Sequence, residues 1–327
     1  MNLTSSAASS ISLTTKLLTI TGPTACGKTS LAAELAYQLG GEIISADSRQ
    51  VFRGMDIGTG KDLAEYHIHG TDIPYHLIDI HEAGYEYNVY QFQNDFIHAF
   101  HEIVSRGRQP ILCGGTGMYI EAVVSGYQLA DAPVDPDFRK QMEAYTDEQL
   151  TERLASYIKL HNHTDTEDRD RLLRALEIQE FHRLHPDEYP HMPDMEHCII
   201  CVTYPRAIVI ERIGQRLRQR LDEGMVDEVR RLLDAGVPEA RLLRYGLEYK
   251  HLTRYLKGEC NYNEMYENLY TDIRRFAKRQ MTWFRRMERQ GIPLHWLDGT
   301  LPFEEKVRRV REIFEESTPA THPAVTP

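Results

Sequence analysis

A glycine-rich octapeptide near the N-terminus decides which folds are open to this chain. Its residues are Gly22, Pro23, Thr24, Ala25, Cys26, Gly27, Lys28 and Thr29. They match the pattern G-x-x-x-x-G-K-[ST], and they lie between an apolar run at 17–21 and an amphipathic stretch at 30–39. The glycines of such a loop let backbone N–H groups and a helix N-terminus converge on one anion. The sequence therefore predicts a P-loop that binds phosphate, with Lys28 adding positive charge and Thr29 a hydroxyl for Mg²⁺.

Further apolar runs follow the loop at intervals that are typical of strands alternating with helices. These candidate strands are residues 42–46, 75–80, 110–113, 198–204 and 294–297. Alternation of this kind favours a parallel sheet with helices on both faces. We therefore predict an α/β fold built on a P-loop parallel sheet.

The alternation breaks after Gly126, where a stretch rich in proline and aspartate begins, and it resumes near Cys198. Candidate helices in between lie at residues 138–145, 147–160 and 168–182. We therefore predict an inserted, mostly helical domain that interrupts the P-loop core. The predicted boundaries are a core at 16–126 and 197–316, an insert at 127–196, and flexible tails at 1–15 and 317–327.

The net charge excludes some classes of protein. The chain has 327 residues with 38 Lys and Arg against 49 Asp and Glu, a formal net charge of −11. This excludes a uniformly basic nucleic-acid coat, although a basic stripe on an acidic body remains possible. Two segments, 206–220 and 274–289, concentrate arginines, and they fit either a polyanion or a solvated helix face. No apolar window is long enough to span a membrane and no secretory signal is evident, so we expect a cytoplasmic protein without membrane contact.

Two predicted strand ends carry polar residues that could do chemistry. Asp47 ends the second predicted strand, where a carboxylate could act as a general base; a helix cap or a magnesium ligand is the alternative. Asp79 ends the next strand and is a weaker candidate for magnesium binding or a structural role. Thr116 lies in a glycine-rich turn at 114–119 and could hydrogen-bond a substrate, although a structural role for this turn fits equally well.

The phosphate loop alone does not identify the reaction. A nucleotide-hydrolysing switch or motor, a small-molecule kinase, and a transferase whose leaving group is a diphosphate would all use it. The residue types leave these alternatives open.

Several longer motifs carry a more specific resemblance. They occur in order at residues 22–29, 45–48, 52–59, 76–79, 114–119, 171–177 and 277–284. Over roughly residues 17–300 the chain resembles the tRNA dimethylallyltransferases, the IPP transferase family. The segments Gly-Met-Asp-Ile-Gly-Thr at 54–59 and Ala-Lys-Arg-Gln-Met-Thr-Trp at 277–283 are more specific than the P-loop.

The resemblance implies an enzyme that transfers a dimethylallyl group from dimethylallyl diphosphate to tRNA. The acceptor would be the exocyclic amine of the adenine 3′-adjacent to the anticodon, and diphosphate would be released. Asp47 would take the amine proton and Thr116 would contact the adenine. Lys28, Thr29 with Mg²⁺, and Arg216 would hold the diphosphate. A P-loop small-molecule kinase is the alternative, although a small acceptor would not need the two basic segments.

The resemblance also implies which residues contact tRNA. They are Asp47, Ser48, Arg49, Gln50, Thr116, Arg139, Asp170, Arg171, Leu172, Leu173 and Arg174. One departure is Glu248, which stands before Tyr249 where the family usually has glycine. We expect a monomer whose partners are the anticodon stem-loop and dimethylallyl diphosphate.

Overall fold

The computed structural model describes residues 15–126, 132–157, 168–185 and 191–317. The chain divides into two compact units, one of Met1–Gly126 with Pro193–Pro327 and a second of Tyr127–Met192. The predicted tails at 1–15 and 317–327 lie outside the described residues, apart from Thr15 and Ser317.

The first unit is built on a six-stranded sheet with the order β5-β2-β6-β1-β7-β8, and every pair in it is parallel. The strands are β1 (Thr15–Thr21), β2 (Gly41–Ser45), β5 (Tyr75–His76), β6 (Gln109–Gly114), β7 (Met195–Thr203) and β8 (His295–Asp298). This confirms the predicted α/β fold. The last residue of β1, Thr21, lies opposite Gly114 and Cys201 in the register. The turns that leave β1 and β6 therefore start at the same level.

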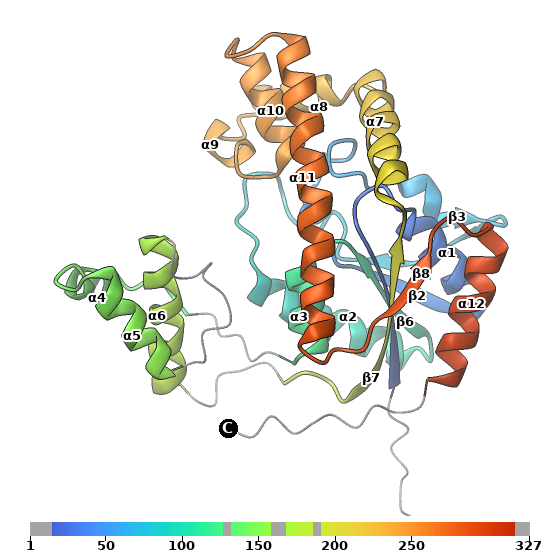
Figure 1. Cartoon of the computed structure of the whole chain (residues 1–327), viewed down its shortest axis with the longest axis horizontal. Helices are drawn as coiled ribbons and strands as arrows, with labels where there is room; N and C mark the ends of the chain where they lie inside the picture. Colours follow the sequence, from blue (N-terminus) through green and yellow to red (C-terminus); the bar gives the residue numbers. More distant parts are fainter. Residues whose placement is uncertain (1–14, 127–131, 158–167, 186–190, 318–327) are drawn as a thin grey trace, which may run out of the picture. The chain divides into compact units, whose positions relative to one another are not determined.

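Helices cover both faces of this sheet (Figure 1). On one face α1 and α12 share a buried core with the strands, and α2 and α3 cover the other. Their bounds are α1 (Lys28–Leu39), α2 (Val89–Ser105), α3 (Gly117–Val124) and α12 (Phe303–Glu316). Helix α1 begins after Gly27 and ends at Gly40, both of which have left-handed φ angles of 75° and 60°. Glycines at these two positions fix the length of the helix that carries the phosphate loop.

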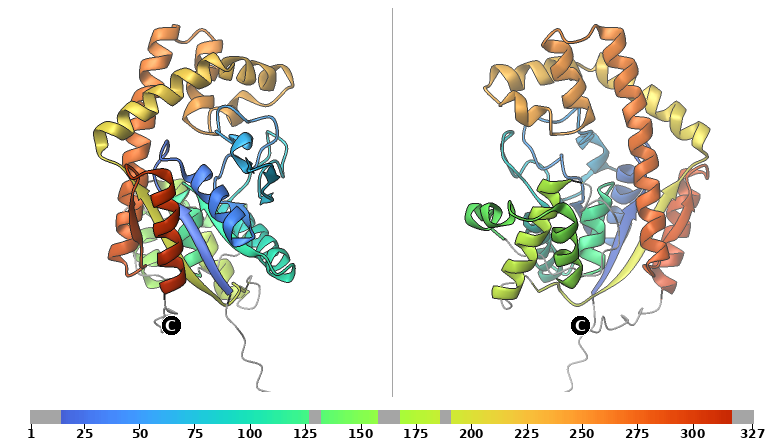
Figure 2. Two further views of the ribbon diagram at one scale, coloured as in Figure 1. Left: turned by 90° about the vertical axis from the view of Figure 1, so that its right-hand side faces the viewer. Right: turned by 60° about the vertical axis from the view of Figure 1, so that its left-hand side comes forward.

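A second set of helices follows β7. They are α7 (Arg206–Asp222), α8 (Met225–Asp234), α9 (Glu239–Leu242), α10 (Leu247–Leu256) and α11 (Tyr262–Arg289). Helices α7 and α11 pack together and extend past the sheet, and they carry α8, α9 and α10 at their far end (Figures 1 and 2). A capping box between Asn261 and Glu264 starts the 28-residue α11.

A stretch between β2 and α2 contains η1 (Leu63–Tyr66) and a two-stranded antiparallel hairpin of β3 (His67–Ile68) and β4 (Thr71–Asp72). The predicted strand at 75–80 is shorter than expected. Only its first two residues pair with β2. Leu77 and Asp79 then adopt left-handed φ angles of 62° and 56°, which no strand accommodates.

The second unit contains three described helices, α4 (Pro136–Met142), α5 (Asp147–Tyr157) and α6 (Arg169–Leu184). They enclose a small apolar core of Met142, Leu150, Leu154, Leu172, Leu173 and Leu176. The predicted insert ran from 127 to 196, but Met195 and Glu196 already pair with β1 as part of β7. Residues 127–131, 158–167 and 186–190 of that prediction lie outside the described residues.

Candidate active site

A cavity of about 860 Å³ lies at the carboxyl end of the sheet. Its walls come from the P-loop, the turns after β2 and β6, the segment at 58–66, and helices α7, α10 and α11. The sequence-predicted residues Lys28, Thr29, Asp47, Thr116 and Arg216 all line it. The fold therefore gathers these residues around one space. Lys28, Thr29, Asp47 and Thr116 follow strand ends, as the sequence predicted, and Arg216 reaches the same space from α7.

The phosphate loop has the backbone geometry that its glycines predict. Gly22 has a φ of 145°, and a Cβ there would lie 2.4 Å from a carbonyl oxygen of β7. Ala25 adopts a left-handed φ of 62° and its carbonyl accepts from Arg212 Nε at 2.7 Å. The Lys28 ammonium folds back over the loop and donates to the Pro23 carbonyl at 2.8 Å. The loop is thus held in shape by its own backbone and by an arginine of α7.

Gln280 of α11 ties the phosphate loop to the turn after β6. Its Oε1 accepts the backbone N–H of Thr24 at 2.9 Å, and its Nε2 donates to the Gly115 carbonyl at 2.8 Å. Trp283 packs on Gly117, where a Cβ would lie 2.4 Å from the indole ring. This clamp explains the motif at 277–284. Its residues were recognised in the sequence, but the clamping role of Gln280 was not.

Asp47 and Thr116 lie on neighbouring turns, after β2 and β6. One Asp47 carboxylate oxygen accepts the backbone N–H of Arg49 at 2.9 Å. The Thr116 hydroxyl accepts the backbone N–H of Ser48 at 3.1 Å. These bonds fix both side chains at the cavity wall, and β6, which leads to Thr116, lies between the strand that ends before Asp47 and the strand that ends at the phosphate loop. A base and a hydroxyl positioned in this way can act together on one bound group.

The predicted magnesium ligand, Thr29, has a carboxylate beside it. The Glu65 carboxylate accepts hydrogen bonds from the Thr29 hydroxyl and the Ser30 backbone N–H. Burial raises the pKa of Glu65, and the neighbouring Asp62 raises it further. Among the described ranges there is no group of three or more His, Cys, Asp or Glu that could hold a metal. The oxygen donors of Thr29 and Glu65 fit Mg²⁺ only together with phosphate oxygens of a substrate.

Two arginines one turn apart on α7 face the segment at 58–66. Arg216 Nη2 donates to Asp62 Oδ2 at 2.5 Å, whereas Arg220 Nη2 lies 3.6 Å from the same oxygen. Both guanidinium groups pack on Gly60, where a Cβ would lie 1.6 Å from Arg220 Nη2 and 2.6 Å from Arg216 Nη2. Only glycine therefore fits at position 60.

The segment at 56–58 wraps around a buried carboxylate of α8. Glu228 accepts the backbone N–H groups of Asp56, Ile57 and Gly58 at 2.8, 2.7 and 3.0 Å. It also accepts the Tyr249 hydroxyl at 2.7 Å, and that ring leaves no room for a Cβ at Gly58. The motif at 54–59 therefore builds the cavity wall.

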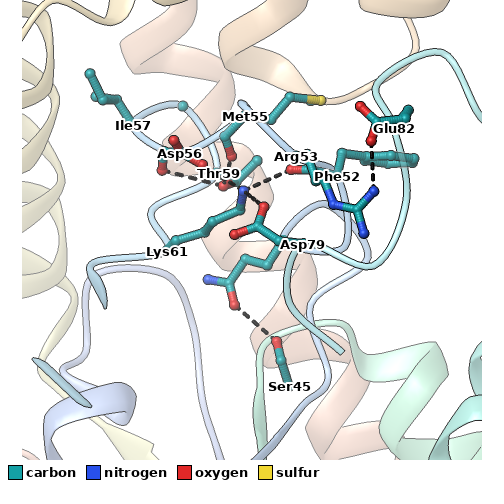
Figure 3. A network of polar contacts seen from close by, with 12 residues as sticks. Ser45, Phe52, Arg53, Met55, Asp56, Ile57, Thr59, Lys61, Asp79 and Glu82 are labelled. Atoms are coloured by element: carbon teal, nitrogen blue, oxygen red, sulfur yellow. Dashed lines mark hydrogen bonds and ion pairs between the residues drawn. The ribbon is translucent and has the colours of Figure 1, made fainter. Parts of the chain in front are cut away.

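A buried lysine completes this wall (Figure 3). The Lys61 side chain is 1% exposed, and its ammonium donates to the Phe52 carbonyl at 2.7 Å, to Asp56 at 2.6 Å and to Asp79. Of the two roles predicted for Asp79, magnesium binding or structural work, this contact supports the structural one.

The predicted tRNA contacts after β2 divide into two groups. Asp47, Ser48 and Arg49 line the cavity and are only partly buried. Gln50 also lines the cavity, but its side chain is buried and makes its hydrogen bonds within the protein. It accepts from the Ser45 hydroxyl at 2.9 Å and donates to the Gly60 carbonyl at 3.0 Å. Gln50 therefore has a structural role that the sequence did not indicate.

In the second unit, Arg139 and Arg174 converge on the buried Glu177. Arg139 donates to both Glu177 oxygens at 2.7 and 3.1 Å, and Arg174 donates to one at 3.3 Å. Burial raises the pKa of the Glu177 carboxyl group. Hydrogen bonds donated by Arg139, the Asp135 backbone N–H and Arg174 outweigh this and lower the pKa. Both predicted RNA-binding arginines thus also hold this unit together.

The remaining predicted contacts lie on α6. Asp170 and Arg171 are exposed. Leu172 and Leu173 are 0% and 8% exposed and belong to the apolar core of the unit. The side chains of these two leucines are therefore not available for the predicted tRNA contact, because they pack inside the unit.

The basic segment of α11 is largely a surface feature. Its exposed cations are Arg275, Lys278, Arg279, Arg285 and Arg289. Arg286 instead pairs with the buried Glu121 and stacks on Trp283 at 4.1 Å. Arg279 lines the cavity, so the positive charge of this helix reaches the site. No helix among the described residues is long and apolar enough to cross a membrane.

Known proteins share both the sequence and this fold. The family model described as IPP transferase matches residues 50–287, and that described as isopentenyl transferase matches residues 15–79. A tRNA dimethylallyltransferase 1 of Parabacteroides distasonis is 53% identical over 298 residues, which cover 91% of this chain and 97% of that protein. The corresponding protein of Geotalea daltonii is 48% identical over 94% of this chain and 99% of its own length.

Among solved structures, the tRNA isopentenylpyrophosphate transferase of Bacillus halodurans superposes with a TM-score of 0.67 and 35% identity. The match covers 92% of this chain and 97% of that chain. The sequence, the fold and the cavity thus lead to one assignment, which confirms the resemblance seen in the motifs. The chain belongs to the tRNA dimethylallyltransferases, the IPP transferase family.

Proposed function

We propose that the cavity joins a dimethylallyl group to a tRNA adenine in a single displacement. The amine nitrogen of the adenine attacks the first carbon of dimethylallyl diphosphate. The bond from that carbon to the diphosphate oxygen breaks, and its electron pair leaves with the diphosphate. Asp47 takes the amine proton, a contribution of about 10²–10⁴-fold to the rate. Thr116 hydrogen-bonds the same base from the neighbouring turn.

The leaving group acquires negative charge where the phosphate loop is positive. Backbone N–H groups at the start of α1, Lys28 and Arg216 all line this part of the cavity. Removing one preorganised donor of this kind costs about 3 kcal/mol of transition-state stabilisation. Thr29 and Glu65 would hold a magnesium ion, which neutralises charge on the diphosphate.

The acceptor base must leave its stack to reach Asp47. Unstacking costs a few kcal/mol and is cheapest in a single-stranded loop such as an anticodon loop. Exposed cations on α11, together with Arg49 and Arg171, would supply the phosphate contacts that position the RNA. We propose that the protein acts as a monomer. We place it in the cytoplasm, where tRNA is found.

The observation that carries the proposal is the meeting of Asp47, Thr116 and the phosphate loop in one cavity with a basic helix. A small-molecule kinase would also use a phosphate loop and a strand-end aspartate. It would not need Arg279 and the other exposed cations of α11, nor the Gln280 clamp that couples this helix to the loop.

The test supplies both kinds of donor to the same protein. Purified protein with Mg²⁺ is incubated with anticodon stem-loop RNA and dimethylallyl diphosphate, and separately with ATP and candidate metabolites. We expect mass spectrometry to find the dimethylallyl group on a single adenine and diphosphate in solution. An Arg308→Ala variant, whose side chain is exposed on α12, serves as the matched control and should behave as wild type. Phosphoryl transfer from ATP without any alkylated RNA would contradict the proposal.

A further inference from the structure

Tyr85 presents an aromatic ring that is exposed and yet held in place. It lies in the segment between β5 and α2, and it is 42% exposed. The ring stacks on His81, with the two centroids 4.2 Å apart and the planes 10° from parallel. The Tyr85 hydroxyl accepts from Gln91 Nε2 at 2.5 Å, and Gln91 belongs to the capping box that starts α2. These contacts fix the ring while part of it stays open to solvent.

Tyr245 connects this segment to the cavity. Its hydroxyl accepts the backbone N–H of Gly84 and donates to the Tyr85 carbonyl, both at 2.7 Å. Tyr245 itself lines the cavity, and the Arg49 guanidinium lies over its ring, 5.8 Å from the centroid. The backbone N–H of Arg49 donates to Asp47, the proposed base. A short series of contacts therefore leads from the proposed base to the exposed ring.

The carboxylates that flank Tyr85 in the sequence are paired with arginines. Glu82 lies 2.6 Å from Arg53, and Glu86 lies 3.1 Å from Arg241. Each of these acids thus has a cation beside it. The segment therefore does not present two uncompensated negative charges to an RNA backbone.

The proposed reaction leaves RNA bases without a stacking partner. The target adenine must turn out of the loop to reach Asp47, and this uncovers a face of each neighbouring base. Proteins that bind single-stranded RNA often cover such faces with aromatic side chains. A ring that is already fixed loses little conformational freedom when a base stacks on it. The chemistry and the position of Tyr85 therefore fit one of the uncovered bases.

We propose that Tyr85 stacks on a base adjacent to the target adenine and stabilises the loop with that adenine turned out. The ligand class is an unpaired nucleobase of the anticodon loop. Because every base has a π face, this contact contributes affinity without selecting the identity of the base. The inference rests on the proposed turning of the adenine into the cavity.

The first experiment measures the dissociation constant of anticodon stem-loop RNA without any donor present. Tyr85→Leu removes the ring and should weaken binding about tenfold. Tyr85→Phe keeps the ring and should bind close to the wild-type value. The control is Tyr37→Leu, since Tyr37 is 44% exposed and its ring lies 4.9 Å from that of His69, but on α1 beside the β3–β4 hairpin. It should also bind as wild type.

A second set of RNAs locates the contact. Stem-loops that lack the base on the 5′ side or on the 3′ side of the target adenine are bound to the wild type and to Tyr85→Leu. Removing the stacked base should weaken wild-type binding about tenfold. Tyr85→Leu should then cause little further loss with that RNA, because the partner of the ring is already missing.

Three results would overturn the stacking contact. One is wild-type binding that neither base deletion weakens, which requires no variant to fold. A second is wild-type affinity of Tyr85→Leu for the intact stem-loop, which would leave the ring to a protein partner. A third is an equal loss from Tyr85→Leu with the intact RNA and with both deleted RNAs. Absence of alkyl transfer by the wild type would instead contradict the proposed function itself.

Discussion

Lys61 and Arg220 are two buried cations that adjoin Gly60, and the protein treats them differently. Lys61 is 1% exposed and donates to a carbonyl and two carboxylates. Arg220 is 8% exposed, yet its Nη2 atom packs on Gly60 without a hydrogen-bond partner among the described residues and lies 3.6 Å from Asp62. A cation whose bonds are all made within the protein stabilises the fold. One that keeps a buried donor unbonded contributes less, because the cost of removing it from water is not fully offset.

The same contrast holds for two carboxylates near these cations. Glu228 accepts three backbone N–H groups and a tyrosine hydroxyl, which fixes the segment at 56–58. Glu248 lines the cavity beside Arg220. The wall therefore combines a closed polar network, which gives it shape, with a carboxyl-bearing residue that lines the cavity.

The largest effect on stability should come from Lys61→Met. This change removes the hydrogen bonds of the ammonium to Asp56, Asp79 and the Phe52 carbonyl, and the loss of these charge-assisted bonds should cost about 3 kcal/mol. Urea unfolding measures the loss. The control is Arg53→Ala, because the ion pair of Arg53 with Glu82 is exposed on both sides and should contribute less than about 1 kcal/mol. Equal losses in the two variants would break the comparison.

Glu228→Gln should have the next largest effect. The amide keeps one acceptor oxygen where the carboxylate served three backbone N–H groups and Tyr249, so we expect a loss of about 2 kcal/mol. Hydrogen exchange should become faster at the amides of residues 56–58. Unchanged exchange there would show that the carboxylate does not hold the segment.

Arg220→Met should change the free energy of unfolding by no more than about 1 kcal/mol, because replacing a poorly paired buried charge by an apolar side chain is often neutral. Asp62 keeps its bond to Arg216 in this variant. The measurement is the same urea titration as for Lys61→Met. A loss as large as that of Lys61→Met would place Arg220 in the structural network.

The smallest effects are opposite pH dependences of stability at two carboxyl groups. Burial raises the pKa of the Glu42 carboxyl group, but hydrogen bonds from Arg106 and His76 outweigh this and lower the pKa below 4.5. Glu42 therefore stabilises the fold above about pH 4.5, and this contribution disappears as pH falls through the folded-state value. The pKa of Glu248 is raised above 4.5, so its folded state binds the extra proton and stability falls as pH rises through the folded-state value.

Unfolding measured between pH 3 and 7 checks both signs. Glu42→Gln should remove the loss of stability on the acid side, and Glu248→Gln should remove the decline as pH rises. In each variant, the slope of the unfolding free energy against pH should change by an amount equivalent to less than one bound proton. A change of the same sign in both variants would contradict these assignments.

Much of the fold could be predicted because its signals are local. Short stretches of sequence predict the phosphate loop, the helix bounded by Gly27 and Gly40, and the alternation of strands and helices. The sequence did not predict the place of β6 between β1 and β2, because strand order depends on contacts between distant segments. The early end of the strand at Tyr75–His76 also escaped prediction, since the left-handed φ of Leu77 carries no sequence signal.

For the site, the sequence indicated which residues would meet but not what each one touches. Asp47, Thr116 and the phosphate loop share one cavity, and their chemical roles remain predictions. Gln50 and Leu172 were both expected at the RNA; both side chains are buried, although Gln50 also lines the cavity. A motif shared with a family does not separate core residues from contact residues. Such distinctions depend on tertiary packing.

The central claim is that Asp47 acts in the chemical step and not in RNA binding. Single-turnover transfer and RNA affinity should be measured together for the wild type and Asp47→Asn, whose remaining oxygen can still accept the Arg49 N–H. The account predicts a rate about 10²–10⁴-fold lower with the dissociation constant for the stem-loop nearly unchanged. A wild-type rate in the variant, or a rate loss explained entirely by weaker RNA binding, would contradict it.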